Sequence, residues 1–213
     1  MESISYAITV CNERQEIEKL LNQLFKYIKK EDEIIVQFDT QNGTPEVRDY
    51  LEHTAVECAV KGINFHRIFF SLNGDFSTFK NELISHCTRK WVFCIDADEL
   101  CHENLLENLP NLLSINATDV IALPRENYVE GLTQEDINKW RWGVDEKNRI
   151  NYPDYQQRIF LNNKGIKYIN KVHEILSGYK TITQVPPVLE GWCLIHSKNI
   201  DRQRRQNLFY EQL

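Results

Sequence analysis

The clearest chemical pattern in this sequence is a pair of aspartates two residues apart. Asp96 and Asp98 directly follow an apolar run at residues 91–95, and such a run is typical of a strand that is buried on both faces. Two carboxylates at the end of a buried strand are costly unless a cation or a hydroxyl group takes up their charge. The pair therefore indicates a divalent metal ion. The alternative is structural, because Asp98 or Glu99 could cap a following helix.

Polar side chains also lie at the ends of two earlier apolar runs. Thr9, Asn12 and Glu13 come at the end of the first run, and Asp39 ends the second. Ligands of parallel sheets bind beyond the carboxyl ends of the strands, so these side chains are candidates for binding. Asp39 has a structural alternative as a turn-forming residue before residues 41–43.

Strand-like and helix-like segments alternate through the first half of the chain. Apolar residues at helical spacing follow each of the first three apolar runs. The expected strands are residues 3–10, 33–39, 63–70 and 91–95, and the expected helices are residues 17–28, 46–60 and 76–87. Repeated strand–helix units of this kind predict an α/β fold with a mostly parallel central sheet and helices on both faces.

The second half has shorter apolar runs. We expect a helix at residues 105–113, strands at 120–124, 156–161, 167–169 and 172–176, and a final apolar run at 189–195. The polar stretch at residues 126–151 is expected to be a long loop, and long loops in compact domains are usually functional or mobile. No repeat or linker divides the chain, so residues 1–213 are expected to form a single domain.

Composition excludes several classes of protein. The 213 residues are 42% hydrophobic and 26% charged, which excludes a disordered or fibrous chain. A net charge of −6 argues against a nucleic-acid partner, because phosphate binding depends on lysine and arginine. No apolar run approaches the roughly 20 residues that span a bilayer, and no signal peptide is recognisable. The six irregularly spaced cysteines indicate reduced thiols and a cytoplasmic protein.

Several motifs together resemble glycosyltransferase family 2, whose members transfer sugars from nucleotide-sugar donors. They are Ile-Thr-Val-Cys-Asn-Glu at residues 8–13, Phe-Asp-Thr-Gln-Asn-Gly-Thr at 38–44, Phe-Lys-Asn-Glu at 79–82, the Asp-x-Asp segment at 91–99, Tyr-Pro-Asp-Tyr-Gln-Gln-Arg-Ile-Phe at 152–160 and Val-His-Glu at 172–174. The chain is similar to lipopolysaccharide-core-type and phage-type members. The resemblance implies a single-domain A-type (GT-A) fold, a Rossmann-like α/β/α sandwich with a nucleotide-binding half at residues 1–99 and an acceptor-binding half at 100–213.

The resemblance also implies roles on the donor side. Thr9, Asn12 and Glu13 would contact the nucleoside, and Asp39 would accept a hydrogen bond from uracil. Lys80 would approach the diphosphate or the base, although an ordinary exposed helix lysine is the alternative.

The metal site follows from the same resemblance. Asp98 would hold Mn²⁺ or Mg²⁺, Asp96 would face the ribose and the water shell of the metal, and His196 would be a further ligand unless it is structural. The cation would stabilise the charge of the departing nucleoside diphosphate.

A basic cluster near the end of the chain could close over the diphosphate once the donor binds. It consists of Lys198, Arg202, Arg204 and Arg205. A solvated helix face is the alternative, above all for Arg204 and Arg205.

Transfer with inversion requires a general base for the acceptor hydroxyl, and a carboxylate is the usual choice. Asp154 and Glu174 are the candidates, with Asp154 favoured because it precedes a predicted strand. Trp140, Trp142 and Tyr152 are candidates to stack on an acceptor sugar, with core packing as the alternative.

The resemblance thus implies a metal-dependent, inverting, hexosyltransferase-like enzyme that moves a sugar from a UDP-linked donor to a hydroxyl on a glycan or related molecule. One alternative is a nucleotidyltransferase that makes sugar nucleotides, but the Gly-rich phosphate loop expected near its first strand is absent. The other is an inactive nucleotide- or carbohydrate-binding relative.

Overall fold

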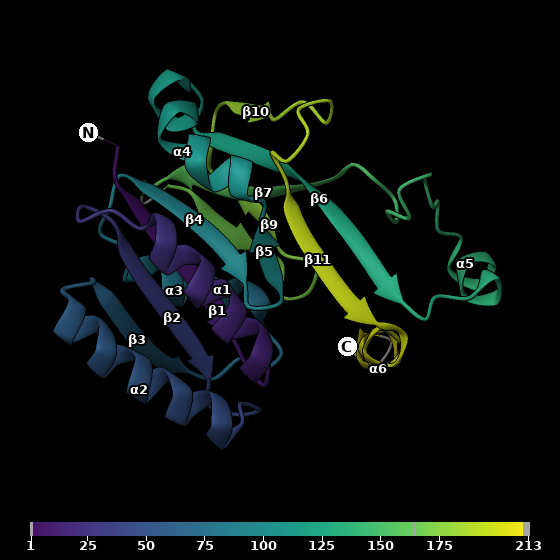
Figure 1. Cartoon of the computed structure of the whole chain (residues 1–213), viewed down its shortest axis with the longest axis horizontal. Helices are drawn as coiled ribbons and strands as arrows, with labels where there is room; N and C mark the ends of the chain where they lie inside the picture. The colour runs from purple at the N-terminus through teal and green to yellow at the C-terminus, as the bar shows by residue number, and fades with distance from the viewer. Residues whose placement is uncertain (1, 164, 211–213) are drawn as a thin grey trace.

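Strands and helices alternate along the first half of the chain, as the sequence predicts (Figure 1). The structure is a computed structural model, and it describes residues 2–163 and 165–210. The strands are β1 (Ile4–Val10), β2 (Glu33–Asp39), β3 (Phe65–Phe70), β4 (Trp91–Asp96), β5 (Glu99–Cys101), β6 (Val120–Glu130), β7 (Asp154–Leu161), β8 (Lys167–Ile169), β9 (Ile175–Ser177), β10 (Ile182–Gln184) and β11 (Leu194–Asn199). The helices are α1 (Arg14–Tyr27), α2 (Pro45–Lys61), α3 (Phe76–Ser85), α4 (Glu103–Ile115), α5 (Gln134–Trp140) and α6 (Ile200–Tyr210).

One mixed sheet forms the centre of the fold. Its strand order is β3-β2-β1-β4-β7-β6-β11-β5, and β10 adds to β6. Within the described chain, five of its pairings are parallel and three are antiparallel, the latter involving β7 and β5. The prediction of an α/β fold with a mainly parallel central sheet is therefore confirmed.

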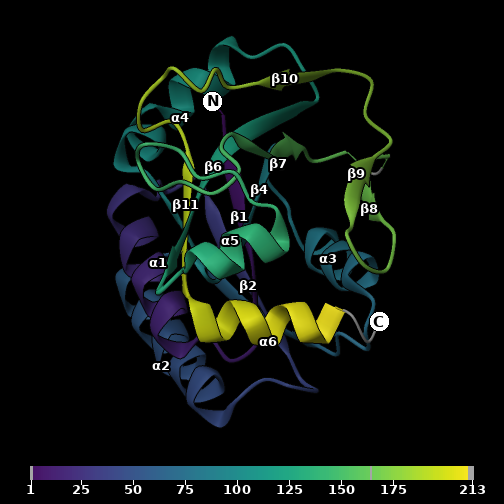
Figure 2. The same ribbon diagram turned by 90° about the vertical axis from the view of Figure 1, so that its right-hand side faces the viewer.

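Two apolar layers cover the sheet, one on each face. Helices α1, α2 and α4 pack on one face, and α3 packs on the other together with the separate β8–β9 hairpin (Figure 2). Neither apolar layer covers the carboxyl ends of the parallel strands. Polar groups at those ends can therefore meet a ligand.

Local sequence explains why the helices begin and end where they do. In α1 the residues Ile17, Leu20, Leu21 and Leu24 are buried, and their spacing places them on one helix face. Helix α2 ends at Gly62, whose φ of 69° is a left-handed conformation that glycine adopts without strain.

Residues 126–151 are not the long loop that their polarity suggests. Strand β6 continues to Glu130 because residues 125–130 pair with β11, and the apolar pattern gives no sign of that distant pairing. Helix α5 follows, and it begins at a capping box formed by Thr133 and Asp136.

One further prediction about the second half is wrong. The strand expected at residues 172–176 is β9 and begins only at Ile175, because His173 has a φ of 54°, which no strand accommodates. Of the apolar run at residues 189–195, the last two residues lie in a strand, β11, which starts at Leu194.

The structural alternative for the aspartate pair is also excluded, because neither Asp98 nor Glu99 caps a helix. Glu99 lies in β5, and the N-cap of α4 is His102, which accepts a hydrogen bond from the backbone of Asn104. None of the helices within the described residues is long and apolar enough to cross a membrane.

Candidate active site

One cavity lies at the carboxyl ends of β1, β2 and β4, and it has a volume of about 1050 Å³. The structure brings all eleven site residues predicted from the sequence to its lining. They are Thr9, Asn12, Glu13, Asp39, Lys80, Asp96, Asp98, Asp154, Glu174, His196 and Lys198. The volume is close to the upper end of the range of about 300–1,000 Å³ for small-ligand sites, and the lining is rich in charged side chains.

Sheet register explains why distant residues meet in this cavity. Thr9 and Asp96 are register partners on β1 and β4, and the Thr9 hydroxyl donates to Asp96 at 3.1 Å. His196 is likewise beside Asn127 across β11 and β6. The side chains therefore converge because the strands pair, although they are far apart in the sequence.

Asp98 and His196 are in contact with each other in the lining of the cavity. The Nε2 atom of His196 lies 3.2 Å from Asp98 Oδ2. Burial of the Asp98 carboxyl raises its pKa, but the His196 hydrogen bond and the charges of His196 and Arg202 outweigh it and lower the pKa to about 2. Asp98 is therefore an anion in this site at neutral pH.

A hydrogen-bonded chain orients His196. Asp154 is held as a carboxylate by Arg125, and its Oδ2 accepts the Asn127 amide NH₂ at 2.9 Å. The other end of that amide, Asn127 Oδ1, lies 2.9 Å from His196 Nδ1. Because the amide oxygen can only accept, Nδ1 must donate, and the remaining nitrogen Nε2 faces Asp98.

This arrangement fits a metal ion. In the neutral imidazole the Nε2 lone pair would point at a carboxylate oxygen, so the pair is complete only with a proton or a metal ion at Nε2. A carboxylate and a histidine, completed by phosphate oxygens and water, suit Mn²⁺ or Mg²⁺. A hydrogen bond to the far nitrogen of a ligating histidine is the usual arrangement at metal sites.

Asp96 faces cations of the protein instead. Arg158 donates to it at 2.5 Å, and Lys80 Nζ lies 3.2 Å away. Burial raises the pKa of Asp96, but the two cations outweigh it and hold the pKa well below its usual range. Across the described residues, His, Cys, Asp and Glu side chains do not converge in any group of three that could hold a metal ion. Of the three predicted ligands, the structure therefore brings together Asp98 and His196.

The two candidate bases differ in their surroundings. Asp154 accepts from Arg125 Nε at 2.9 Å, from Arg125 Nη2 at 2.7 Å, from Asn127 at 2.9 Å and from Gln156 at 2.8 Å. Burial raises the pKa of Asp154, but the Arg125 charge and these hydrogen bonds outweigh it and lower the pKa. Glu174 pairs with Lys80 Nζ at 2.8 Å.

The nucleoside side of the cavity is built by turns after β1 and β2. Glu13 accepts from the backbone N–H groups of Cys11 at 2.8 Å and Asn12 at 3.0 Å. Asp39 accepts from the backbone of Gln41 at 3.0 Å, so the turn suggested by the sequence is present, and the same residue lines the cavity.

Part of the basic cluster also reaches the cavity. Arg202 on α6 contacts Glu13 at 2.9 Å, Glu16 at 3.0 Å and Asp98 at 3.3 Å. Burial lowers the pKa of Lys198. Lys198 and Arg205 both line the cavity. Arg204 instead pairs with Asp136 of α5 at 3.0 Å.

Of the aromatic residues that could bind a sugar, Trp142 lines the cavity. Trp140 packs on Trp142 with ring centroids 4.6 Å apart. Tyr152 instead lies under the Arg149 guanidinium and donates its hydroxyl to the Pro187 carbonyl at 3.1 Å.

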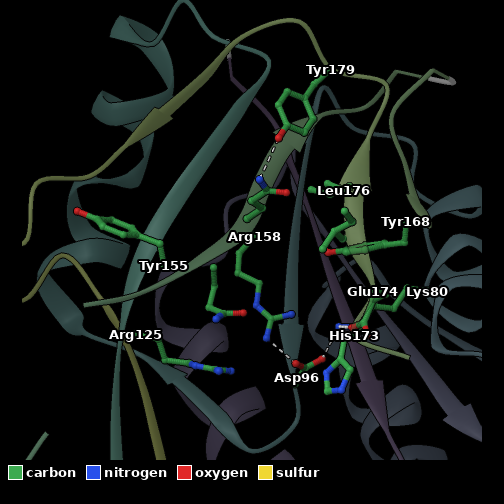
Figure 3. A pocket seen from close by; sticks show the side chains of 13 residues that line it. Lys80, Asp96, Arg125, Tyr155, Arg158, Tyr168, His173, Glu174, Leu176 and Tyr179 are labelled. Carbon is green, nitrogen blue, oxygen red and sulfur yellow. Dashed lines mark hydrogen bonds and ion pairs between the residues drawn. The ribbon is translucent and has the colours of Figure 1, made fainter. Parts of the chain in front are cut away.

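A second cavity, of about 530 Å³, adjoins the first between β7 and the β8–β9 hairpin. Lys80, Asp96, Arg125 and Glu174 line both cavities. Figure 3 shows Arg158 extending towards Asp96, with Tyr155 and Tyr168 on opposite sides of it.

Sequence reasoning missed the buried ion pairs beneath the site. Glu99 is fully buried and accepts from Arg125 at 2.8 Å and from Arg158 at 2.7 Å. Arg158 lies on the strand predicted at residues 156–161, and a charged residue within a strand that must be buried is the signal that could have identified it. Arg125 follows the strand predicted at residues 120–124. Asn127 carries no such signal.

Comparison with known proteins gives a family model and several similar folds. The model described as Glycosyl transferase family 2 matches residues 5–171. The structure of S. aureus TarS 1-349 has a TM-score of 0.61 at 14% identity, and the match covers 92% of this chain and 60% of that one. The same fragment in complex with UDP-GlcNAc has a TM-score of 0.62 at 16% identity, over 93% of this chain and 59% of that one.

A more distant match is the mannosyltransferase PcManGT from Pyrobaculum calidifontis in complex with GDP-Man and Mn²⁺. Its TM-score is 0.50 at 17% identity, over 57% of this chain and 35% of that one. This chain thus spans about three-fifths of the length of TarS 1-349, and identities this low show a shared fold alone. None of the curated proteins matches the chain.

Proposed function

This chain belongs to glycosyltransferase family 2, and from that membership we propose a metal-dependent, inverting transferase that moves a sugar from a UDP-linked donor to a hydroxyl acceptor. The observation that carries the proposal is the convergence of nucleotide-side, metal-side and acceptor-side residues on one cavity. The complexes of TarS with UDP-GlcNAc and of PcManGT with GDP-Man and Mn²⁺ support a nucleotide-sugar donor and a divalent cation.

Residues 1–99 supply most of the donor site. Thr9, Asn12 and Glu13 hold the nucleoside, and Asp39 accepts an N–H of the base. Lys80 and Asp96 pair with each other where the cavity meets its neighbour, and they position the donor sugar.

Asp98 and His196 hold the metal ion, which would neutralise charge on the departing diphosphate. Asn127 keeps the Nε2 lone pair of His196 directed at that position, and Asp154 keeps Asn127 in place. Arg202 and Lys198 add positive charge beside the diphosphate, where a preorganised cation is worth more than in water.

We assign the general base to Glu174 rather than Asp154. The base must touch the acceptor hydroxyl, so it must lie where donor and acceptor meet, and Glu174 lines both cavities. The Asp154 carboxylate accepts four hydrogen bonds and has a lowered pKa, and both properties oppose proton uptake. Residues 100–213 thus supply both the base and the acceptor side.

The proposal can be tested by thermal unfolding of the protein with UDP, GDP, CDP and ADP, each with Mn²⁺ or with EDTA. A ligand that binds only the folded state raises the midpoint temperature by mass action. UDP with Mn²⁺ should give the largest increase, and EDTA should remove most of it. A nucleotide response that is absent, or that EDTA does not change, would contradict the metal-dependent donor site.

A further inference from the structure

The second cavity is continuous with the donor cavity and differs from it in chemistry. Its own walls are β7 and the β8–β9 hairpin, and the hairpin is fixed to α3 by two hydrogen bonds of 2.8 Å between Asn81 and the Tyr168 backbone. The two cavities meet at Lys80, Asp96 and Glu174, which line both of them. A molecule in the second cavity would therefore lie against the proposed base.

The walls of the second cavity combine amides with tyrosines. Gln156 and Gln157 project from β7, and the Gln157 amide donates to the Tyr179 hydroxyl at 3.0 Å. Tyr155 and Tyr168 also line the cavity. Tyrosine offers an apolar ring with a polar tip, and an amide both donates and accepts. These tyrosine and glutamine side chains suit a molecule that presents both apolar C–H faces and hydroxyl groups.

The lysine and arginine side chains of this cavity are already neutralised. Lys80 pairs with Asp96 and Glu174, and Arg158 pairs with Asp96 and Glu99. Arg125 likewise forms ion pairs with two carboxylates, those of Glu99 and Asp154. A phosphate or carboxylate entering here would meet carboxylates beside each of these cations, and like charges at short distance are strongly unfavourable.

We propose that the cavity between β7 and the β8–β9 hairpin is the acceptor subsite, and that it takes a neutral sugar residue rather than a phosphorylated or acidic one. This assignment rests on the proposed function. The acceptor hydroxyl oxygen forms a bond to the anomeric carbon of the donor, its proton passes to Glu174, and the bond from the anomeric carbon to the diphosphate breaks with its electron pair leaving on the nucleoside diphosphate.

Saturation-transfer NMR on the protein with UDP and the diamagnetic ion Mg²⁺ tests the assignment. The probes are the methyl pyranosides of glucose, galactose, mannose and N-acetylglucosamine, compared with the 6-phosphates of the same sugars. At least one neutral glycoside should receive saturation, and its phosphate should receive less. No transfer to any neutral glycoside, or equal or stronger transfer to the phosphates, would overturn the proposal.

Variants tie the signal to this cavity. Gln157→Leu removes the amide. Tyr179→Phe removes only the hydroxyl, and it serves as the second variant if Gln157→Leu folds poorly. Each should weaken glycoside binding about fivefold, as expected for one lost hydrogen bond, with UDP affinity unchanged by calorimetry. Gln184→Leu, at an exposed position of β10 outside both cavities, is the matched control. Glycoside binding that Gln157→Leu and Tyr179→Phe leave intact would place the acceptor elsewhere, whereas failure of UDP to bind the wild type would instead count against the proposed function.

Discussion

The side chains of Asp154, Asn127 and His196 form a hydrogen-bonded chain that ends at Asp98. The donor and the acceptor of each of these hydrogen bonds are fixed, because a carboxylate and an amide oxygen can only accept. The chain therefore fixes the orientation of an amide and the tautomer of a histidine. In this account Asp154 is a positioning residue for the metal site, and it does not take a proton from the acceptor.

Asp154→Asn should therefore weaken metal binding. The variant no longer holds Asn127 in one orientation, and loss of an outer hydrogen bond at a metal site typically costs about 10–100-fold in metal affinity or activity. Calorimetric titration of Mn²⁺ into the UDP-bound protein should show a decrease of at least tenfold. Unchanged Mn²⁺ affinity with a large loss of kcat would return the base role to Asp154.

Glu174→Gln should give the opposite pattern. The substitution keeps the shape and removes the basicity, and general-base catalysis is typically worth about 10²–10⁴-fold. We expect kcat to fall by about 10²-fold or more while Mn²⁺ and UDP affinities stay close to wild type. Near-normal kcat for Glu174→Gln would exclude Glu174 as the base.

At the scale of elements, Arg202 links α6 to the donor cavity and to α1. Arg202 contacts Glu13 and Glu16 at the start of α1 as well as Asp98. The helix thereby places a cation beside the proposed position of the diphosphate.

Arg202→Gln should reduce donor affinity. The variant keeps most of the side-chain length but loses the charge, and a charge-assisted hydrogen bond contributes about 1.5–3 kcal/mol. Calorimetry with UDP and Mn²⁺ should show a decrease of about tenfold or more. Asp201→Asn on the same exposed first turn is the control and should bind UDP normally; equal affinities for wild type and Arg202→Gln would place Arg202 outside the donor site.

The elements that could be predicted are those whose apolar pattern is complete within the segment. Strands β2 and β4 are buried along nearly their whole length, and their polar ends mark the donor cavity. The outer part of β6 becomes a strand only because β11 pairs with it. The capping box of α5 at Thr133 and Asp136 was a local signal that the sequence did contain.

The same distinction applies to the site. The residue type and its position after a buried strand could indicate Asp98, and the resemblance to the family indicated His196 and Glu174. The partner of each could not be predicted, because Arg125 and Asp154 meet across the β6–β7 register at a separation of 29 residues. The role of Asp154 depends on that pairing, and it therefore emerges only from the structure.

At the scale of the molecule, a buried ion cluster joins the two halves of the sheet. Glu99 connects Arg125 of β6 with Arg158 of β7, and Arg158 connects in turn to Asp96 of β4. The Glu99 side chain is 0% exposed. Breaking such a cluster leaves buried charge without compensation.

Glu99→Gln should therefore destabilise the whole fold. Removal of one partner from a buried ion pair costs about 3–5 kcal/mol, and urea unfolding should show a decrease of about 3 kcal/mol or more in the free energy of unfolding. Glu103→Gln, on the exposed first turn of α4, should cost less than about 1 kcal/mol. Similar stabilities for the two variants would mean that the cluster contributes little.

Release of UDP from UDP-sugars tests the central claim most directly. The protein is incubated with a panel of UDP-hexoses and UDP-N-acetylhexosamines, with Mn²⁺ or with EDTA, and free UDP is measured with and without neutral glycosides. The account predicts Mn²⁺-dependent release that a glycoside accelerates and that Asp98→Ala abolishes, while the circular dichroism of that variant stays native. Release that is unchanged by EDTA or by Asp98→Ala, or no release from any donor of the panel, would contradict it.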